Sequence, residues 1–165
     1  MSPHTDSQTH HSTLQVASDW DAVATVVEWF EKFNCKQLPY QIWIEGQTAL
    51  IEGFTNAVRH AHKHLNPQTP VELAVTLDPQ YFQICIWDQG DIFNFEAALE
   101  KLSEKTNDQA FNPLDHEAHW GCIFFLKLRR DYAWTVSYNR ELAGRNCLFL
   151  KKNLVPKVEL PNARD

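Results

Sequence analysis

The 165-residue sequence has no excess of positive charge, no long apolar run and no closely spaced pair of cysteines. Its net charge of -6 argues against a protein that binds the backbone of nucleic acids, since that function needs a basic face. No apolar run is long enough to cross a membrane, and the N-terminus lacks the apolar core of a signal peptide. We therefore expect a cytoplasmic protein that contacts neither nucleic acid nor membrane and has proteins or small molecules as partners.

The cysteines are scattered, without any CxxC spacing, and their neighbours are mostly apolar or neutral. This distribution is typical of reduced, partly buried thiols in a cytosolic protein. A disulfide or a cysteine metal site is the less favoured interpretation. The four residues are Cys35, Cys85, Cys122 and Cys147.

The length of the chain and its 44% of hydrophobic residues are those of one globular domain. Residues 1–12 are polar and aperiodic, which predicts a disordered N-terminal arm whose histidines belong to a loose tail rather than to a metal site. Residues 153–165 contain two prolines and are predicted to form a C-terminal tail. The domain itself is then expected over residues 13–152.

Apolar residues alternate in five short segments and recur at helical spacing in others, as in strands and helices respectively. Two pairs of alternating segments flank short turns, and each pair predicts an antiparallel hairpin. Hairpins with helices covering one face make an α+β two-layer sandwich with a mostly antiparallel sheet. The predicted strands are residues 13–18, 71–77, 81–87, 132–138 and 146–152, and the predicted helices begin near residues 19, 40 and 122.

Between residues 90 and 120 the pattern weakens. Residues 93–102 have helical potential, whereas residues 103–119 have the composition of a long, mobile loop. Loops of this length in a compact domain are usually functional or disordered. Gly121 then opens a helix, and helix N-termini bind phosphates through free backbone N–H groups.

The helix predicted from residue 40 carries Asn56 well inside it, although Asn is a mediocre helix former. Glu52 and His60 lie one turn before and after Asn56, so the three share a polar stripe, for which a solvated face is the ordinary explanation. Zinc binding by His60 and His64 is disfavoured because no third ligand stands at a suitable spacing. The apolar stripe of the same helix comprises Leu50, Phe54, Ala57, Val58, Ala61 and Leu65.

Asp88 ends a predicted buried strand and is followed by Gln89 and Gly90. A carboxylate at a strand end, beside a glycine free to adopt positive φ, can point into a cleft and accept hydrogen bonds. By itself the Asp-x-Gly sequence is also common as a plain turn.

The stretch EGFTNAVRHA, which starts at Glu52, resembles the E-x-x-x-N-A-x-x-H-A box of the GHKL ATPase superfamily, most closely its anti-sigma factor serine/threonine kinase branch. WDQGDIFNFE is similar to the D-x-G box of that branch. HWGCIFFLKLRRDYAWTV lies where those proteins carry a glycine-rich box, a helix and a strand. The resemblance covers residues 13–152 and implies the Bergerat, histidine-kinase-like ATPase fold with a long ATP-lid loop.

By this resemblance Glu52 would be the catalytic base, Asn56 a ligand of Mg²⁺ and Asp88 the residue that reads the adenine of ATP. An amide oxygen suits Mg²⁺, and a carboxylate one turn away can orient or deprotonate an attacking hydroxyl. Asp88 would accept a hydrogen bond from the exocyclic amine of adenine, whereas guanine presents a carbonyl there, so ATP should be preferred over GTP. Gly90 would let the chain pass close to the base.

Two segments depart from the family pattern. His119 stands where the glycine-rich box has its first glycine, so that only Gly121 is kept, and residues 144–146 replace the usual Gly-Thr. A histidine adds bulk where phosphates approach and does not easily take positive φ. His119, Gly121 and Arg145 are the candidates for contacting phosphate.

The resemblance implies an ATP-dependent protein-serine kinase that acts as an anti-sigma factor. It would bind a sigma factor, phosphorylate a serine of an anti-sigma-factor antagonist and form a homodimer. The altered glycine box motivates an alternative, a non-catalytic, nucleotide-independent module of the same fold that sequesters a protein partner. A third interpretation, an unrelated α+β domain whose motifs match by chance, predicts that Asp88→Asn leaves nucleotide affinity unchanged.

Overall fold

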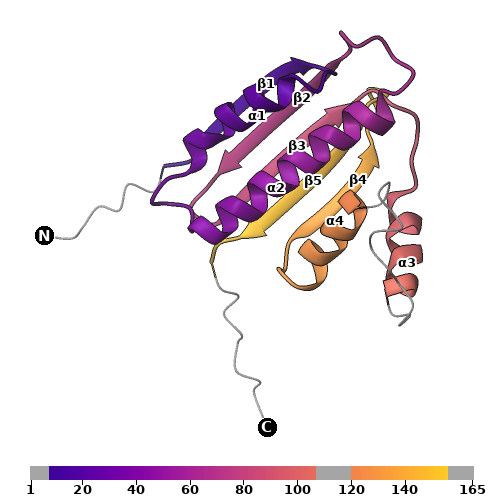
Figure 1. Cartoon of the computed structure of the whole chain (residues 1–165). Coiled ribbons are helices and arrows are strands. Elements are labelled where there is room, and N and C mark those ends of the chain that lie inside the picture. Colours follow the sequence, from indigo (N-terminus) through magenta and orange to yellow (C-terminus); the bar gives the residue numbers. More distant parts are fainter. Residues whose placement is uncertain (1–7, 107–119, 156–165) are drawn as a thin grey trace, which may run out of the picture.

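The computed structural model describes residues 8–106 and 120–155. Its centre is a five-stranded sheet with the order β1-β2-β3-β5-β4, in which each neighbouring pair is antiparallel (Figure 1). The strands are β1 (His10–Ala17), β2 (Pro70–Leu77), β3 (Tyr81–Asp88), β4 (Thr135–Arg140) and β5 (Asn146–Asn153). The helices are α1 (Ala22–Phe30), α2 (Tyr40–Asn56), α3 (Phe95–Thr106) and α4 (Trp120–Arg130), with a 3-10 turn η1 (Glu31–Phe33) and a π-helical turn η2 (Ala57–Ala61).

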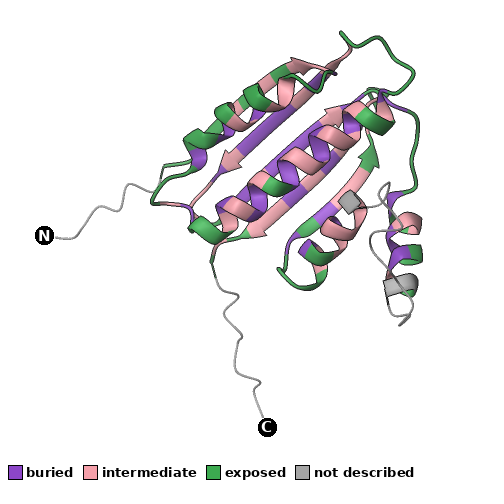
Figure 2. Ribbon diagram, viewed as in Figure 1, coloured by how far each residue is buried: buried purple, intermediate pink, exposed green. Residues whose placement is uncertain are grey.

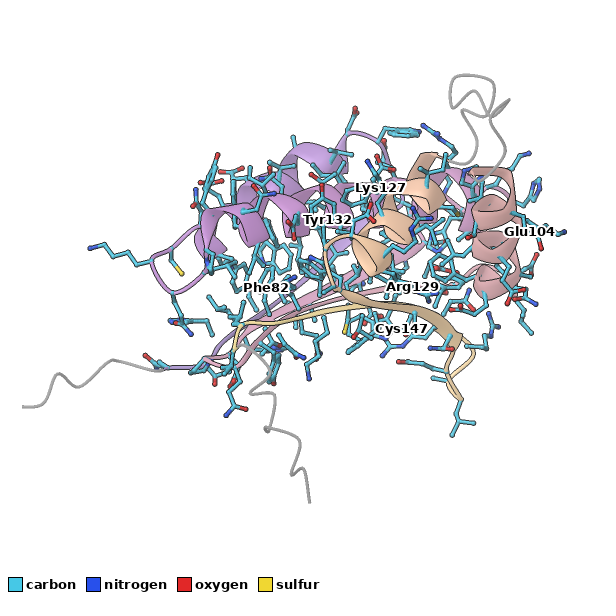
Figure 3. The ribbon with its side chains drawn as sticks, turned by 90° about the horizontal axis from the view of Figure 1, so that it is seen from below. Phe82, Glu104, Lys127, Arg129, Tyr132 and Cys147 are labelled. Carbon is cyan, nitrogen blue, oxygen red and sulfur yellow. The ribbon has the colours of Figure 1, made fainter. Side chains whose placement is uncertain are left out.

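The helices lie on one face of the sheet, and the period of two in the strands places the apolar set of side chains beneath them (Figure 2). In β3 the side chains of Phe82, Ile84 and Ile86 are at most 1% exposed. Figure 3 views the sheet from a perpendicular direction, with Phe82 between the strands and the helices. The two-layer α+β sandwich predicted from the sequence is therefore confirmed.

Helix α2 approaches the sheet closely because two of its residues on that side are glycines. A Cβ atom on Gly53 would lie 2.4 Å from Cδ1 of Ile86 and 2.8 Å from Cδ2 of Leu148. One of the nearest atoms to a Cβ on Gly46 would be in the ring of Phe82, at 2.7 Å. This close packing fixes the C-terminal end of α2 over β3 and β5, where the candidate site lies.

Several predicted boundaries are wrong, among them both ends of strand β4, which spans Thr135–Arg140 rather than residues 132–138. Strand β1 begins at His10 rather than residue 13, because His10, His11 and Ser12 pair with the far end of β2 and so belong to the sheet, not to a disordered arm. Helix α3 continues to Thr106, four residues into the predicted loop. The other predicted arm, loop and tail residues, 1–7, 107–119 and 156–165, lie outside the described part of the chain.

Among the described residues, every helix is too short or too polar to cross a lipid bilayer.

Candidate functional site

A pocket of about 510 Å³ lies where the end of α2 and the turn η2 pass over the ends of β3, β4 and β5. Helices α3 and α4 contribute Phe95, Cys122 and Phe125 to its walls. Because these elements are far apart in the sequence, the pocket exists only in the folded chain. Its apolar lining includes Ala57, Ile86, Ile92, Phe93, Phe125 and Leu148.

Two rows of side chains cross strands β3, β5 and β4 at this end of the sheet, as the strand register shows. One row is made of Ile86, Leu148 and Tyr138, all of which line the pocket. The next row is made of Asp88, Asn146 and Arg140. An apolar floor and a cluster of polar side chains therefore lie side by side.

Asp88 lies at the β3 end of the polar row and is only 4% exposed. Its Oδ1 accepts hydrogen bonds from the backbone N–H of Gly90 at 2.9 Å and from Nδ2 of Asn146 at 2.8 Å. Its Oδ2 accepts one from the hydroxyl of Tyr138 at 2.7 Å. Three donors thus compensate a buried carboxylate, whose unpaired burial would be very costly.

The polar stripe predicted on the helix reaches the pocket in part. Asn56 and His60 line it, and so does His64. Helix α2 ends at Asn56 and widens into η2, where the backbone N–H of His62 donates to the carbonyl of Ala57 at 2.8 Å. Such π turns add a residue to the helical repeat and are frequent at functional sites. Asn56 therefore sits at a change of helix type, beside the pocket.

His62 anchors this turn to the strand end. It is 4% exposed, and its Nε2 accepts a hydrogen bond from the backbone N–H of Gln89 at 2.8 Å. Its Nδ1 is buried with no hydrogen-bond partner among the described residues. Burial lowers the pKa of His62, and the negative charge of Asp88 partly opposes this shift. The neutral imidazole is therefore the form that the fold favours.

Gly90 does not adopt the positive φ that the sequence suggested, whereas its predicted closeness to a bound base stays a prediction. Its φ is not positive, so conformational freedom does not explain the glycine. A Cβ atom would instead lie 2.7 Å from both the carbonyl oxygen and the Cβ of Ala61. Gly90 lines the pocket, and what requires it is the close approach of the Asp-x-Gly segment to η2.

Glu52 lies one turn before Asn56 on α2 and is not among the residues that line the pocket. The residue is half-buried. Burial raises the pKa of its carboxyl group, and the positive charge of Arg59 partly opposes the shift. A carboxylate with a raised pKa is a stronger base than an ordinary glutamate.

Arg145 is not brought to the pocket, contrary to prediction. Its guanidinium pairs with Glu72 at 2.8 Å and Glu141 at 2.9 Å, and it lies 4.8 Å from the ring centroid of Trp87. Trp87 and Glu72 occupy the strand positions that alternate with the helix-facing ones, so this network lies on the other face of the sheet. The alternation of β5 explains the error, because Asn146 faces the helices and Arg145 precedes it.

The ionisable side chains of the lining include acidic residues and histidines. Asp88 and Asp91 contribute carboxylates, His60 and His64 contribute imidazoles, and no Lys or Arg lines the pocket within the described residues. Gly121 is the second residue of α4, and His119 lies outside the described residues. That these two residues contact phosphate stays a prediction.

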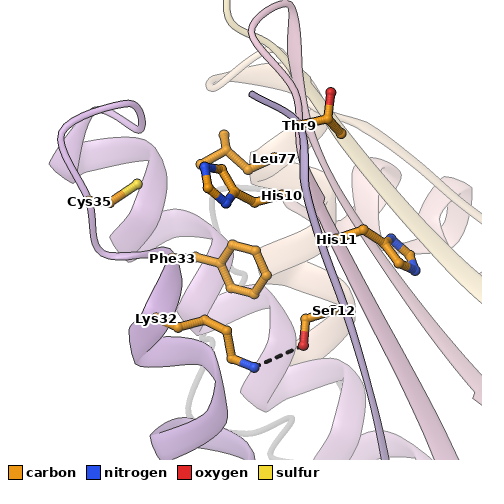
Figure 4. A pocket seen from close by; sticks show the side chains of 8 residues that line it. All are labelled: Thr9, His10, His11, Ser12, Lys32, Phe33, Cys35 and Leu77. Carbon is orange, nitrogen blue, oxygen red and sulfur yellow. Dashed lines mark hydrogen bonds between the residues drawn. The ribbon is translucent and has the colours of Figure 1, made fainter. Parts of the chain in front are cut away.

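A second pocket, of about 440 Å³, lies between the start of β1 and the turn η1 (Figure 4). His10 and Cys35 flank it, and Nζ of Lys32 donates to Oγ of Ser12 at 2.8 Å. His11 points away and bonds Oγ1 of Thr76 at 2.8 Å. In the described ranges, no group of three or more His, Cys, Asp or Glu residues is placed to hold a metal ion.

Sequence reasoning missed Tyr138, Asn146 and Arg140. Arg140 donates to the carbonyl of Gly90 at 2.7 Å and so ties β4 to the Asp-x-Gly segment. Asn146 is 1% exposed and opens the helix-facing alternation of β5. A polar residue at a position that the alternation predicts to be buried was the available signal, and only the strand register shows that it faces Asp88.

Comparison with known proteins agrees with the fold. Residues 16–152 match the family model of the histidine kinase-like ATPase domain. The chain is similar in structure to a chain of the SiaB–SiaC complex from Pseudomonas aeruginosa, with a TM-score of 0.50 and 9% sequence identity over 87% of this chain and 89% of that chain. At this identity the likeness concerns the fold alone. A comparison with curated protein sequences gives no significant match.

Proposed function

Because the chain belongs to the histidine kinase-like ATPase domain family, we propose that it is an ATP-dependent protein-serine kinase that acts as an anti-sigma factor. The observation that carries the proposal is the pocket itself. It places the buried carboxylate of Asp88 and the amide of Asn56 on the lining of one cavity, as binding of a single nucleotide requires.

Each side chain has a chemical task in this proposal. Asp88 accepts a hydrogen bond from the amine of adenine, while the aromatic and aliphatic lining packs against the base. Asn56 is a suitable ligand for Mg²⁺, which prefers oxygen donors, keeps several waters and neutralises phosphate charge. Glu52 accepts a proton from the attacking serine hydroxyl, and its raised pKa favours that step.

The proposal extends to protein partners. The similar structure is that of a complex of SiaB with SiaC, which supports a second protein as a partner of this chain also. We assign that place to an anti-sigma-factor antagonist whose serine accepts the phosphate, and we further propose a sigma factor as the alternative partner and a homodimer as the active form. Light scattering after size exclusion would give the mass of the assembly.

Phosphate transfer tests the catalytic part. The protein is incubated with γ-labelled ATP, Mg²⁺ and an antagonist, and wild type should yield labelled phosphoserine while Glu52→Gln should yield none. Glu28→Gln, which changes an exposed glutamate on α1, is the matched control and should label normally. Equal labelling by wild type and Glu52→Gln would show that Glu52 is not the base.

One observation favours a second candidate, a non-catalytic module that sequesters a partner without nucleotide. The described lining offers two carboxylates and no Lys or Arg to a highly charged triphosphate. Calorimetry separates the candidates, because a kinase should bind Mg-ATP with micromolar affinity and the module should release no heat at millimolar ATP. Such a module would bind its partner equally well with and without Mg-ATP.

A further inference from the structure

Asp88 accepts hydrogen bonds from two side chains on other strands, in addition to the backbone N–H bond that is common for an aspartate at a strand end. Asn146, on the neighbouring strand, and Tyr138, one strand further, both donate to it, at 2.8 Å and 2.7 Å. The backbone N–H of Gly90 adds a third donor at 2.9 Å. The three donors come from separate elements, so the arrangement is a product of the fold and not of one local turn.

Counting acceptor sites shows what remains for a ligand. A carboxylate offers about four lone-pair positions, two on each oxygen. Gly90 and Asn146 both occupy Oδ1, whereas Tyr138 alone occupies Oδ2. Asp88 therefore presents one uncommitted acceptor position, on Oδ2.

The orientation of the Asn146 amide is determined by its surroundings. Besides Asp88, its Nδ2 also donates to the carbonyls of Gly90 at 3.1 Å and Asp91 at 3.2 Å, and its Oδ1 accepts from Arg140 at 3.3 Å. A flipped amide would face three acceptors with its oxygen. The surroundings of Asn146 thus fix its Nδ2 as the donor to Asp88. Asn146 lies behind the pocket, since it is buried and not part of the lining.

Tyr138 is held as a donor as well. Its ring packs against those of Phe93 and Phe95, with centroids 6.3 Å and 6.1 Å away. Burial, followed by the hydrogen bond to Asp88, raises the pKa of the phenol far above its usual value. The hydroxyl keeps its proton and directs it to Oδ2, while the ring lines the cavity.

We infer that Tyr138 and Asn146 are positioning residues that set the base selectivity of the pocket, by leaving Asp88 a single acceptor position suited to the 6-amino group of adenine. The inference rests on the proposed nucleotide binding and adds two residues, Tyr138 and Asn146, that determine which purine Asp88 accepts. A 6-keto purine would bring a carbonyl oxygen against the remaining lone pair. Removing either donor frees a further position, which a bridging water can use to accommodate the keto group.

The test compares two ligands that differ at this position, Mg-ATP and its 6-keto analogue Mg-ITP, by titration calorimetry. Wild type should prefer Mg-ATP, and Tyr138→Phe should lower the ratio of the two affinities by about tenfold, the order expected for one hydrogen bond to a charged group. Tyr81→Phe is the matched control, because Tyr81 lies on the other face of the sheet beside Lys151, and its ratio should equal that of wild type.

A second variant guards against misfolding. Asn146→Ala withdraws a donor without changing any lining side chain, and it should shift the ratio in the same direction. Thermal unfolding midpoints of the ligand-free variants identify any that fail to fold. An unchanged ratio in the folded variants overturns the inference while leaving the kinase proposal intact. Absence of Mg-ATP binding by wild type overturns the nucleotide proposal and this inference with it.

Discussion

Asn56 is the last residue of α2, and the π turn η2 starts at the next residue. In a regular helix an asparagine is unfavourable because its side chain competes for backbone hydrogen bonds. At the change of helix type the backbone pattern is already altered, and the amide lines the pocket. Asn56 therefore disturbs the helix little at this position, and its amide is placed to act as the Mg²⁺ ligand that we propose.

The contact between Gly90 and Ala61 leads to a prediction about stability. Gly90→Ala should lower the free energy of unfolding by about 1–3 kcal/mol, since the added methyl meets backbone atoms of η2 that cannot move separately from the turn. Gly53→Ala should cost less, because its methyl meets the ends of the Ile86 and Leu148 side chains, which can rotate. Urea unfolding of both variants provides the measurement. A larger loss of unfolding free energy for Gly53→Ala than for Gly90→Ala would show that backbone contact with η2 is not what requires Gly90.

His62 gives a prediction about pH. Burial holds its pKa below the usual value of about 6.5, so the unfolded chain takes up this proton at a higher pH than the folded protein does. The contribution of neutral His62 to the free energy of unfolding is therefore complete above about pH 6.5, the usual histidine pKa. It is lost as the pH falls toward the lower pKa that His62 has in the folded state. His62→Gln keeps an acceptor for the backbone N–H of Gln89 and removes the titration.

Unfolding free energies measured from about pH 7.5 down to about pH 5, where histidine titrates, should therefore fall more steeply for wild type than for His62→Gln. His64→Gln is the matched control, as His64 is exposed and two residues away. Parallel curves for wild type and His62→Gln would show that protonation of His62 is not linked to folding.

Local motifs suggested part of the site, whereas contacts that depend on register stayed hidden. Asn56 and Asp88 stand in short boxes that can be read from the chain, and the structure brings both to one pocket. Asn146 and Tyr138 could not be assigned, because their role depends on how β4 and β5 pair with β3. Arg145 was misplaced for the same reason, since a shift of one residue reverses the face of a strand.

At the scale of elements, both hairpins and helix α4 were predictable because their alternation and turn residues are local signals. The stripe of α2 was predictable up to Ala57, but Leu65, assigned to the same apolar face, is 41% exposed. The π turn changes the helical phase after Asn56 and the helical segment ends at Ala61, which a constant period of 3.6 does not anticipate.

Arg129 of α4 joins helix α3 to strand β4, in addition to the packing of three buried side chains of α3, Phe95, Leu99 and Leu102. Its guanidinium makes a bidentate pair with Glu96 of α3, in which Nη1 lies 2.8 Å from Oε2, and it also donates to the carbonyl of Val136 in β4. Bidentate geometry makes this pair stronger than an ordinary surface ion pair, and lysine cannot reproduce it.

Arg129→Lys should therefore increase amide hydrogen exchange in α3 about fivefold, equivalent to roughly 1 kcal/mol for a partly exposed pair, while exchange in β2 and β3 stays unchanged. Mass spectrometry of peptides from both regions gives the comparison. The control is Arg130→Lys on the same helix, whose contact with neighbouring Asp131 is 3.9 Å long. Equal exchange in the two variants would mean that Arg129 does not hold α3.

For the molecule as a whole, three of the five buried polar residues in the described ranges, His62, Asp88 and Asn146, lie together at the end of the core where the pocket opens. Another, Glu45, lies elsewhere on α2 and accepts a hydrogen bond from Trp134. The net charge of -6 and the carboxylates of Asp88 and Asp91 make the surroundings of that pocket unfavourable for an anion. The affinity for the adenine base should therefore be independent of Mg²⁺, because the apolar lining would hold the base. The affinity for the triphosphate should depend on Mg²⁺, because the phosphates need a counter-charge.

This contrast gives a prediction for ligand binding. With Mg-ATP at a hundred times its dissociation constant, linkage stabilises the folded state by about 2.7 kcal/mol, which raises the unfolding midpoint by roughly 5–10 °C for a domain of this size. ATP with EDTA should give little of this rise, and Asn56→Ala should reduce it in the presence of Mg²⁺. Adenosine should give a smaller rise that EDTA leaves unchanged, since it carries no phosphate. If metal-free ATP stabilised the protein as well as Mg-ATP does, charge neutralisation by the metal at Asn56 would be ruled out, and the phosphates would have to be bound by groups of the chain itself.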